Sequence, residues 1–418
     1  MPGELPSAPA VAHLHDEQVI ALLRSGAHAH LLIAHFGESE YRELAQLAKL
    51  AATPKKKRGP LVFILPGIMG SRLAMKRGRT LDLYWLHPQA IAAGQLSELA
   101  LPGSRALKPV GVMLPGYLKM KLMLEVYGFQ PVLHAFDWRA DIERSARGLI
   151  RSIERAGRPV MIVAHSMGAL IARAALGYDV NRRVKRLVQL GAPNEGSFAP
   201  VQALRAVYPT VRKIAALDRK HTAEQLAREV FLTLPGLYQL LPSARAPGEL
   251  DLFEASNWPS DLVPDPKLLM KARRVRARLP GPDERCGVIA GFGQETVVAL
   301  EKRDDMFIYD IRAEGDGTVP LARACWQGAR TWYVHENHGA LSTNGRVLTG
   351  VIDILREGDT KSLQTNEPDL PRTVARRVSD ADFRRHALAK VDWEALSPES
   401  RRRILEPIFT PEFCAPVR

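Results

Sequence analysis

Short apolar runs alternate with amphipathic segments through the middle of the chain. The clearest run is Leu61–Leu65, with five consecutive apolar residues, and similar runs follow at 131–136, 160–164, 184–190, 287–290 and 331–335. Uninterrupted apolar runs of this length are typical of strands buried on both faces of a parallel sheet. Helical patterns separate several of them, most clearly at 142–155 and 168–176. The alternation predicts a doubly wound α/β fold with a mostly parallel sheet.

The pattern is different at the start of the chain. Residues 1–53 are predicted to form a helical extension, in which Ser39 caps a helix. The apolar face of that helix carries Tyr41, Leu44, Leu47 and Leu50. A basic linker, P-K-K-K-R-G-P at 54–60, then leads into the first strand.

The regular alternation also stops after the fifth predicted strand. Residues 197–285 are predicted to form a helical cap inserted between two parts of the core, 54–196 and 286–358, and the clearest helix is at 222–232. An insertion at this point would lie at the carboxyl edge of the sheet, where α/β folds bind ligands. Residues 359–418 are predicted to form a basic helical tail with two helices, which start at Ser379 and at Ser397.

Composition narrows the class of protein. The 418 residues are 46% apolar and 25% charged, which is enough apolar surface for a sizeable core and excludes a disordered chain. Three cysteines are too few for a disulfide scaffold or a zinc site. We find no signal-like segment and no apolar stretch of membrane-spanning length, so a cytoplasmic location is expected.

The net charge of the protein indicates which kind of partner it would attract. With 58 basic and 45 acidic residues the net charge is +13, which favours anionic partners such as lipid head groups, with solvated surface charge as the alternative. Peripheral contact with an anionic membrane surface is compatible with this charge. The chain carries no phosphate-binding loop, dinucleotide fingerprint or nucleic-acid-binding motif, so no cofactor and no nucleic-acid partner is expected.

The strongest chemical signal is the segment 164–168, A-H-S-M-G, between a buried strand and a helix. A nucleophile on a tight strand-to-helix turn needs small residues on both sides, because its backbone is strained and neighbouring elements press close. Ala164 and Gly168 meet that need, so Ser166 is predicted to be a nucleophile. The alternative is a serine that merely caps the helix.

A hydrolytic site also needs donors that stabilise the oxyanion, an acid and a base. The loop 65–71, L-P-G-I-M-G-S, follows the first strand, and its glycines let the backbone turn inward. The amides of Ile68 and Met167 are predicted to form the oxyanion hole, with Met69 as the alternative to Ile68.

The acid and base are expected in the order Ser, acid, His. Asp316 stands between two glycines, in a loop that should hold its side chain rigidly while leaving it partly hydrated. His338 follows the last predicted strand and is preferred as the base over His335, which should still lie in that strand.

Several weaker signals have structural explanations. Asp137, Trp138 and Arg139 are expected to pack and pair, with substrate positioning as the alternative. The early histidines, His13, His15, His28, His30 and His35, lack the spacing of a zinc site. The run K-K-K-R at 55–58 is interpreted as a charged linker, with a head-group or nuclear-import patch as the alternative.

Four segments together resemble the lecithin:cholesterol acyltransferase family and its bacterial α/β-hydrolase relatives: 65–71, 164–168, G-A-P-N-E-G-S at 191–197, and G-D-G-T-V-P at 315–320. The resemblance spans roughly residues 60–356. It implies Ser166 as nucleophile, Asp316 as the residue that orients the base, His338 as base, and the 197–285 insertion as the family's cap. Glu195 departs from the family's pattern, in which a small or apolar residue is common.

These observations favour a serine hydrolase that acts on lipid carboxylic esters through an acyl-serine. Transfer of the acyl group to an alcohol is the alternative, because both reactions share the same acyl-enzyme. A basic membrane- or partner-binding module built on a hydrolase fold is the alternative from a different class.

Overall fold

The computed structural model describes residue 11 and residues 13–53, 59–78, 80–103, 106–370, 374–385, 388–393 and 395–409. The basic run at 55–58 lies outside these ranges. Within them, no helix has the length and apolar character needed to cross a bilayer.

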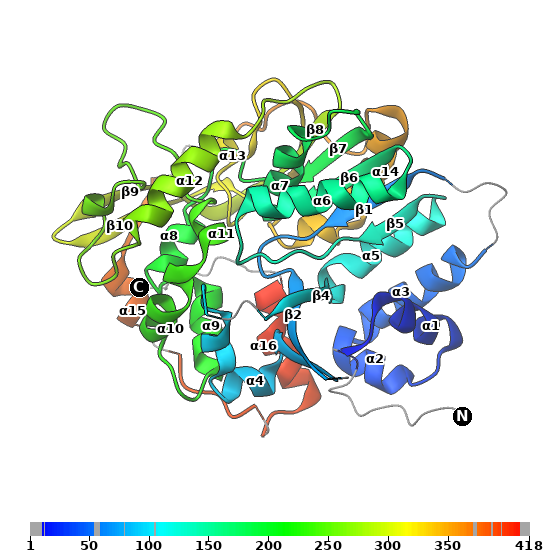
Figure 1. The fold of residues 1–418 in the computed structure, drawn as a ribbon, viewed down its shortest axis with the longest axis horizontal. Helices are drawn as coiled ribbons and strands as arrows, with labels where there is room; N and C mark the ends of the chain where they lie inside the picture. The colour runs from blue at the N-terminus through cyan, green and yellow to red at the C-terminus, as the bar shows by residue number, and fades with distance from the viewer. Residues whose placement is uncertain are drawn as a thin grey trace.

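A six-stranded sheet forms the centre of the molecule (Figure 1). Its order is β11-β8-β7-β6-β1-β5, and every neighbouring pair is parallel. The strands are β1 (Leu61–Leu65), β5 (Gln130–Leu133), β6 (Val160–His165), β7 (Val184–Leu190), β8 (Cys286–Phe292) and β11 (Arg330–His335). All six predicted apolar runs are therefore confirmed as strands of one parallel sheet, although β5 ends before residues 134–136.

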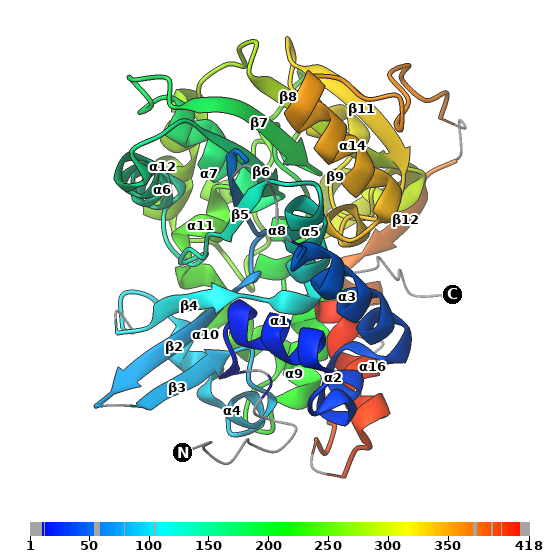
Figure 2. The ribbon, with the colours of Figure 1, turned by 90° about the vertical axis from the view of Figure 1, so that its right-hand side faces the viewer.

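Helices cover both faces of this sheet (Figure 2). On one face α6 (Ile142–Ala156) and α7 (Met167–Leu176) share a core with Phe63 and Leu65 of β1. On the other, α5 (Leu114–Val126) and α14 (Gly345–Glu357) share a core with Val62 and Ile64. Successive residues of β1 point to opposite faces, so burial on both sides explains its uninterrupted apolar run.

The segment 197–285 is helical in the structure. It contains α8 (Ala199–Leu204), α9 (Pro209–Leu217), α10 (Ala223–Glu229), η3 (Phe231–Thr233), α11 (Pro235–Tyr238), η4 (Ala255–Asn257) and α12 (Pro266–Arg278). Thr222 caps α10 in a capping box with Gln225. That this segment acts as a cap, and that the chain divides at the predicted boundaries, stay predictions.

The structure also contains two small antiparallel sheets that the sequence did not predict. One has the order β3-β2-β4 and the other β12-β10-β9. Their strands are β2 (Ser71–Arg77), β3 (Thr80–Trp85), β4 (Lys108–Val112), β9 (Gln294–Arg303), β10 (Met306–Gly315) and β12 (Arg376–Ser379). The segment after residue 358, predicted as a basic helical tail, thus also contains a strand, β12. The sequence R-R-V-S of β12 has a single buried apolar residue, Val378, and becomes a strand only because β10 offers its edge.

The two predicted tail helices are present. Helix α15 (Asp380–Arg385) follows Ser379, whose hydroxyl accepts from the amide of Asp382. Helix α16 (Pro398–Phe409) follows Ser397, whose hydroxyl accepts from the amide of Ser400.

Three helices precede the sheet: α1 (Asp16–Ser25), α2 (Ala29–Phe36) and α3 (Glu38–Ala51). They share a third core with Leu118 and Leu122 of α5. Figure 2 shows this group beside α5, with α16 next to α2, so the N-terminal helices and the last described helix meet there. The prediction that Ser39 caps α3 is wrong, because the helix starts one residue earlier and Gly37 is its N-cap.

Candidate active site

Ser166 lies on a strained turn between β6 and α7. Its φ and ψ are 54° and −122°, a region that residues with a side chain seldom adopt. The Ser166 amide donates to the Leu190 carbonyl across the sheet. A Cβ added to Gly168 would lie 2.4 Å from the Pro66 carbonyl oxygen, so the turn can approach β1 only with glycine there. The sharp strand-to-helix turn that the sequence predicts is thus present.

Asp316 and His338 form a buried pair at the carboxyl end of the sheet. The Nδ1 atom of His338 donates to Oδ2 of Asp316 at 2.7 Å. The other carboxylate oxygen accepts from the amides of Thr318, at 2.9 Å, and Val319, at 2.7 Å. Asp316 is only 1% exposed, so the expectation that it stays partly hydrated is wrong. The two amide donors take the place of water on this carboxylate.

His338 lies in the loop after β11, and its side chain reaches the cavity that Ser166 also lines. Because Nδ1 is occupied by Asp316, Nε2 is left as the acceptor of the neutral ring. His335 is the last residue of β11 and is exposed, so it lies outside this arrangement. The structure therefore brings His338, and not His335, to the serine.

Two glycines at strand ends make room for this pair. A Cβ on Gly191, after β7, would lie 3.0 Å from both Oδ2 of Asp316 and Nδ1 of His338. A Cβ on Gly291 of β8 would lie 2.8 Å from the Asp316 Cβ. The backbone at these two glycines therefore packs closely against the Asp316 carboxylate and the His338 ring and fixes their positions.

The loop after β1 passes directly beside the serine. A Cβ on Gly67 would lie 3.1 Å from the Ser166 Cβ and 3.5 Å from its Oγ. The Gly67 amide is already used, since it donates to the Tyr117 hydroxyl at 2.8 Å. Among the described residues, no hydrogen-bond partner is found for the amides of Ile68, Met69 and Met167. Ile68 and Met69 line the cavity, and Met167 is the first residue of α7.

A chain of hydrogen bonds that the sequence analysis missed ties these parts together. Because the Tyr117 hydroxyl accepts from Gly67, its own proton goes to Nδ1 of His165, at 2.8 Å. Nε2 of His165 then donates to the His338 carbonyl at 2.9 Å. Burial, and next the neighbouring His338, lower the pKa of His165 to about 3, so its ring is neutral.

Of the two side chains that form this hydrogen-bond chain, only His165 stands in a recognisable sequence motif. His165 stands inside the A-H-S-M-G segment, next to the serine, and is 6% exposed. It lines the cavity, and its ring nitrogens bond to the Tyr117 hydroxyl and the His338 carbonyl. Tyr117 lies on α5 within an apolar stretch that carries no motif. Its role becomes visible only when α5 is placed against the loop after β1.

The cavity at the site has a volume of about 110 Å³ and mostly apolar walls. Its apolar side chains come from the loop after β1, from Trp85 and Met113, and from Leu237 and Leu240 of the 197–285 segment. Trp85 donates its indole N–H to the Met69 carbonyl at 2.7 Å, which fixes one wall to the loop. An apolar group attached to a reacting carbonyl would fit such walls.

The remaining sequence signals lie outside the cavity. Arg139 is 1% exposed and forms an ion pair with Asp137, while the Trp138 indole donates to the Ser71 carbonyl. These contacts agree with packing and pairing rather than with substrate positioning. No cluster of His, Cys, Asp or Glu suited to a metal occurs among the residues that the structure describes.

Glu195 belongs to a loop that buried arginines hold in place. Arg173 and Arg276 donate to the Asn194 carbonyl, and Arg323 donates to the Glu195 carbonyl. Burial lowers the pKa of Arg276 to about 10, although the charge of Glu195 opposes that shift. The departure from the family's pattern at Glu195 thus places a carboxylate near three arginines behind the site.

Sheet order and the serine turn together define an α/β-hydrolase. All strands of the central sheet are parallel, helices cover both faces, and the serine stands at the end of a central strand before a helix. More particularly, residues 117–263 match the family model of lecithin:cholesterol acyltransferase. This stretch includes A-H-S-M-G and G-A-P-N, so the resemblance inferred from the motifs is confirmed there. No curated protein sequence gives a significant match.

Solved structures with a similar fold include a lipase and a phospholipase. A chain of the Tle4–Tli4 complex is 15% identical, with a TM-score of 0.48, over 73% of this chain and 100% of that one. The lipase BlEst2 of Bacillus licheniformis in its mature form is 15% identical, with a TM-score of 0.38, over 73% and 94%. The phospholipase PlaB of Legionella pneumophila is 11% identical, with a TM-score of 0.35, over 72% and 57%. At these identities the likeness concerns the fold alone.

Proposed function

We propose that the protein is a serine hydrolase that acts on carboxylic esters of lipids. The observation that carries this proposal is the meeting of three elements at one cavity: the serine on its strained turn, the histidine held by a buried carboxylate, and the glycine loop beside the serine. The match to a family of lipid acyltransferases supports a lipid ester as substrate.

In the proposed mechanism, Nε2 of His338 takes the proton of the Ser166 hydroxyl as its oxygen attacks the ester carbonyl. Asp316 keeps the imidazole in the required tautomer and stabilises its charged form. The amides of Ile68 and Met167 donate to the developing oxyanion. His338 then gives its proton to the leaving alcohol, and an acyl-serine remains.

The acyl-serine is resolved by water, which His338 deprotonates in the second half of the cycle. The product is a free fatty acid. An alcohol in place of that water would give acyl transfer by the same steps, and the family match specifically supports this second reaction. The apolar walls of the cavity suit the acyl chain in either case.

The test is an ester panel, from short p-nitrophenyl esters to phospholipid vesicles, with wild type and two histidine variants. We expect His338→Ala to lose about 10⁴-fold or more in kcat, because the nucleophile loses its base. His335→Ala is the matched control, because that exposed ring lies only three residues away, and it should keep full activity. Equal activity of the two variants would refute the assignment of the base.

Product analysis separates hydrolysis from transfer. Free fatty acid as the sole product, with or without an added alcohol acceptor, supports hydrolysis. A new ester that forms in proportion to the acceptor supports acyl transfer. If wild type turns over no ester but binds anionic vesicles in a salt-sensitive way, the binding-module alternative replaces both.

A further inference from the structure

A second and larger cavity lies where the N-terminal helices meet α16. Its volume is about 690 Å³, within the range of about 300–1,000 Å³ that small-molecule sites have. Its walls come from α2, α3, β2, the start of α5 and α16. Among the residues that line it, Met113 is the one that also lines the cavity at Ser166.

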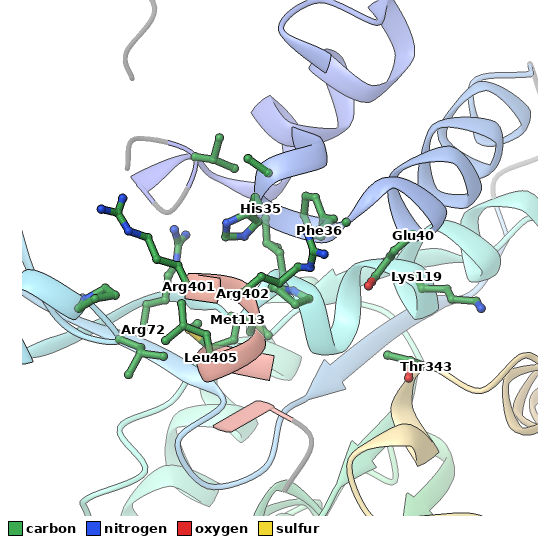
Figure 3. Close-up of a pocket in the computed structure, with 18 of the residues that line it drawn as sticks. His35, Phe36, Glu40, Arg72, Met113, Lys119, Thr343, Arg401, Arg402 and Leu405 are labelled. Atoms are coloured by element: carbon green, nitrogen blue, oxygen red, sulfur yellow. The ribbon is translucent and has the colours of Figure 1, made fainter. Parts of the chain in front are cut away.

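The cavity is bordered by guanidinium groups from two separate elements (Figure 3). Arg72 comes from β2, and Arg401 and Arg402 come from α16. Arg72 is 6% exposed, and its Nη1 donates to the Leu14 carbonyl at 3.0 Å. Burial lowers its pKa, although the charge of Asp16 opposes that shift. A buried cation beside an open cavity is stabilised by an anion placed there, since burial removes the water that would otherwise solvate it.

Several carboxylates near this positive region already pair with other basic side chains. On α3, Glu38 pairs with Arg42 and Glu43 pairs with Lys119, whereas Glu40 also faces the cavity. Arg402 has no ion pair with any carboxylate among the described residues, and its guanidinium rests against Gly37. His35 adds no charge at neutral pH, because burial and the charge of Arg72 lower its pKa to about 4.

Apolar side chains form another part of the lining, and one residue is shared with the cavity at Ser166. Phe36, Leu114, Trp393 and Leu405 contribute to the walls of the larger cavity. Met113 lines both this cavity and the one at Ser166. A polar head and an apolar body in one ligand would therefore match the two parts of the lining.

We propose that this cavity binds an anionic amphiphile, whose phosphate or carboxylate head lies against Arg72, Arg401 and Arg402 and whose apolar part lies along Met113. The planar guanidinium group donates two parallel hydrogen bonds to either head, which is why arginine suits both. If the ligand is also the substrate, an anionic lipid ester would place its head here and its ester bond at Ser166. That part of the inference rests on the proposed function.

Binding is tested with three probes that share one alkyl chain: dodecyl phosphate, dodecanoate and dodecylphosphocholine, below their micelle-forming concentrations. Calorimetry on wild type should show that one or both anionic probes bind at least about tenfold more tightly than the zwitterion. Tighter binding of dodecyl phosphate indicates that the natural ligand is an anionic phospholipid. Tighter binding of dodecanoate indicates a fatty acid. Equal binding of all three probes would overturn the proposal.

The variants use two neighbouring arginines of α16. Arg402→Met should weaken binding of the favoured anionic probe about tenfold, and Arg402→Lys should lose less because it keeps the charge. Arg403→Met is the matched control, since Arg403 is exposed and pairs with Glu399. Equal effects at positions 402 and 403 would contradict the site, and thermal melting shows that each variant is folded.

None of the three probes is a carboxylic ester, so the binding result does not depend on Ser166. Loss of binding with an intact serine mechanism would refute this site alone. Binding without any ester turnover would leave the site standing and remove the proposed function.

Discussion

The two cavities are built from different parts of the chain. The one at Ser166 is small and lies at the ends of core strands, where Gly67, Gly168 and Gly191 let backbone and side chains touch. The larger one lies between terminal helices and a small sheet, and charged side chains surround it. In the two proposals, residues at the ends of the core strands carry out the chemistry, whereas the N-terminal helices, β2 and α16 select the head of the ligand.

The largest effect is expected when the carboxylate behind the base is neutralised. Asp316→Asn should keep the fold, because an amide oxygen can still accept from Thr318 and Val319, but it favours the wrong tautomer of His338. A comparable change in a serine protease lowers kcat by about 10⁴-fold, and we expect a loss of that order in ester turnover. Thermal melting separates this loss from unfolding, and near-normal kcat in a folded variant would show that Asp316 does not orient the base.

A smaller effect is expected when the hydrogen-bond chain behind the site is broken. Tyr117→Phe leaves the Gly67 amide and His165 Nδ1 without their shared partner in a buried place. We expect kcat to fall about 10- to 100-fold with little change in KM, because the loop beside the serine is positioned less well.

A purely structural role for Tyr117 would give a different result. It would lower the melting temperature and leave kcat of the folded enzyme unchanged. Tyr127→Phe serves as the control, because Tyr127 is exposed and lies outside the cavity.

Stability against pH probes the same chain through His165. Its pKa lies near 3 in the folded state and near 6.5 in the unfolded state, so only the unfolded chain binds a proton between these values. The contribution of His165 to stability is therefore present above pH 6.5 and is lost as the pH falls toward 3. The slope is about 1.4 kcal/mol per pH unit for one such proton.

Urea unfolding of wild type and His165→Gln between pH 7 and pH 4 measures this contribution. The variant should lose less stability on acidification than wild type. Parallel curves would show that His165 is protonated in the folded state too. His35 and His134 have pKa values of about 4 for the same reason, burial, so part of the acid sensitivity should remain in the variant.

The smallest effect concerns the larger cavity. Arg402→Met should leave kcat/KM for a short p-nitrophenyl ester within about twofold of wild type, because that substrate lacks an anionic head. The ratio of activity on phosphatidylglycerol to that on phosphatidylcholine should fall about tenfold. A uniform loss on all esters would mean that the two cavities are not functionally separate.

The sequence predicted the central sheet because each of its strands carries its own signal. Buried parallel strands are often apolar without interruption, so Leu61–Leu65 and the apolar run 160–164 of β6 could be located from the sequence alone. Strands such as Arg376–Ser379 could not, since their pairing depends on a distant partner and their composition is polar. Helix ends followed local capping at Thr222 and Asn344 but not at Ser39, where Gly37 supplies the turn instead.

The same distinction applies to the site. Ser166, Asp316 and His338 each stand in a short segment whose glycines or strand end mark it locally, and the structure brings all three together. Tyr117 and the larger cavity arise from contacts between segments far apart in the chain, for which the sequence has no local mark. The hydration of Asp316 was misjudged for that reason, because its burial depends on β7 and β8 as well as on its own loop.

Covalent labelling of Ser166 tests the central claim most directly. Wild type is treated with a fluorophosphonate, and the modified peptide is identified by mass spectrometry. The account predicts a single adduct on Ser166, much slower labelling in His338→Ala, and unchanged labelling in His335→Ala. An adduct on another serine, or ester turnover that persists in Ser166→Ala, would contradict it.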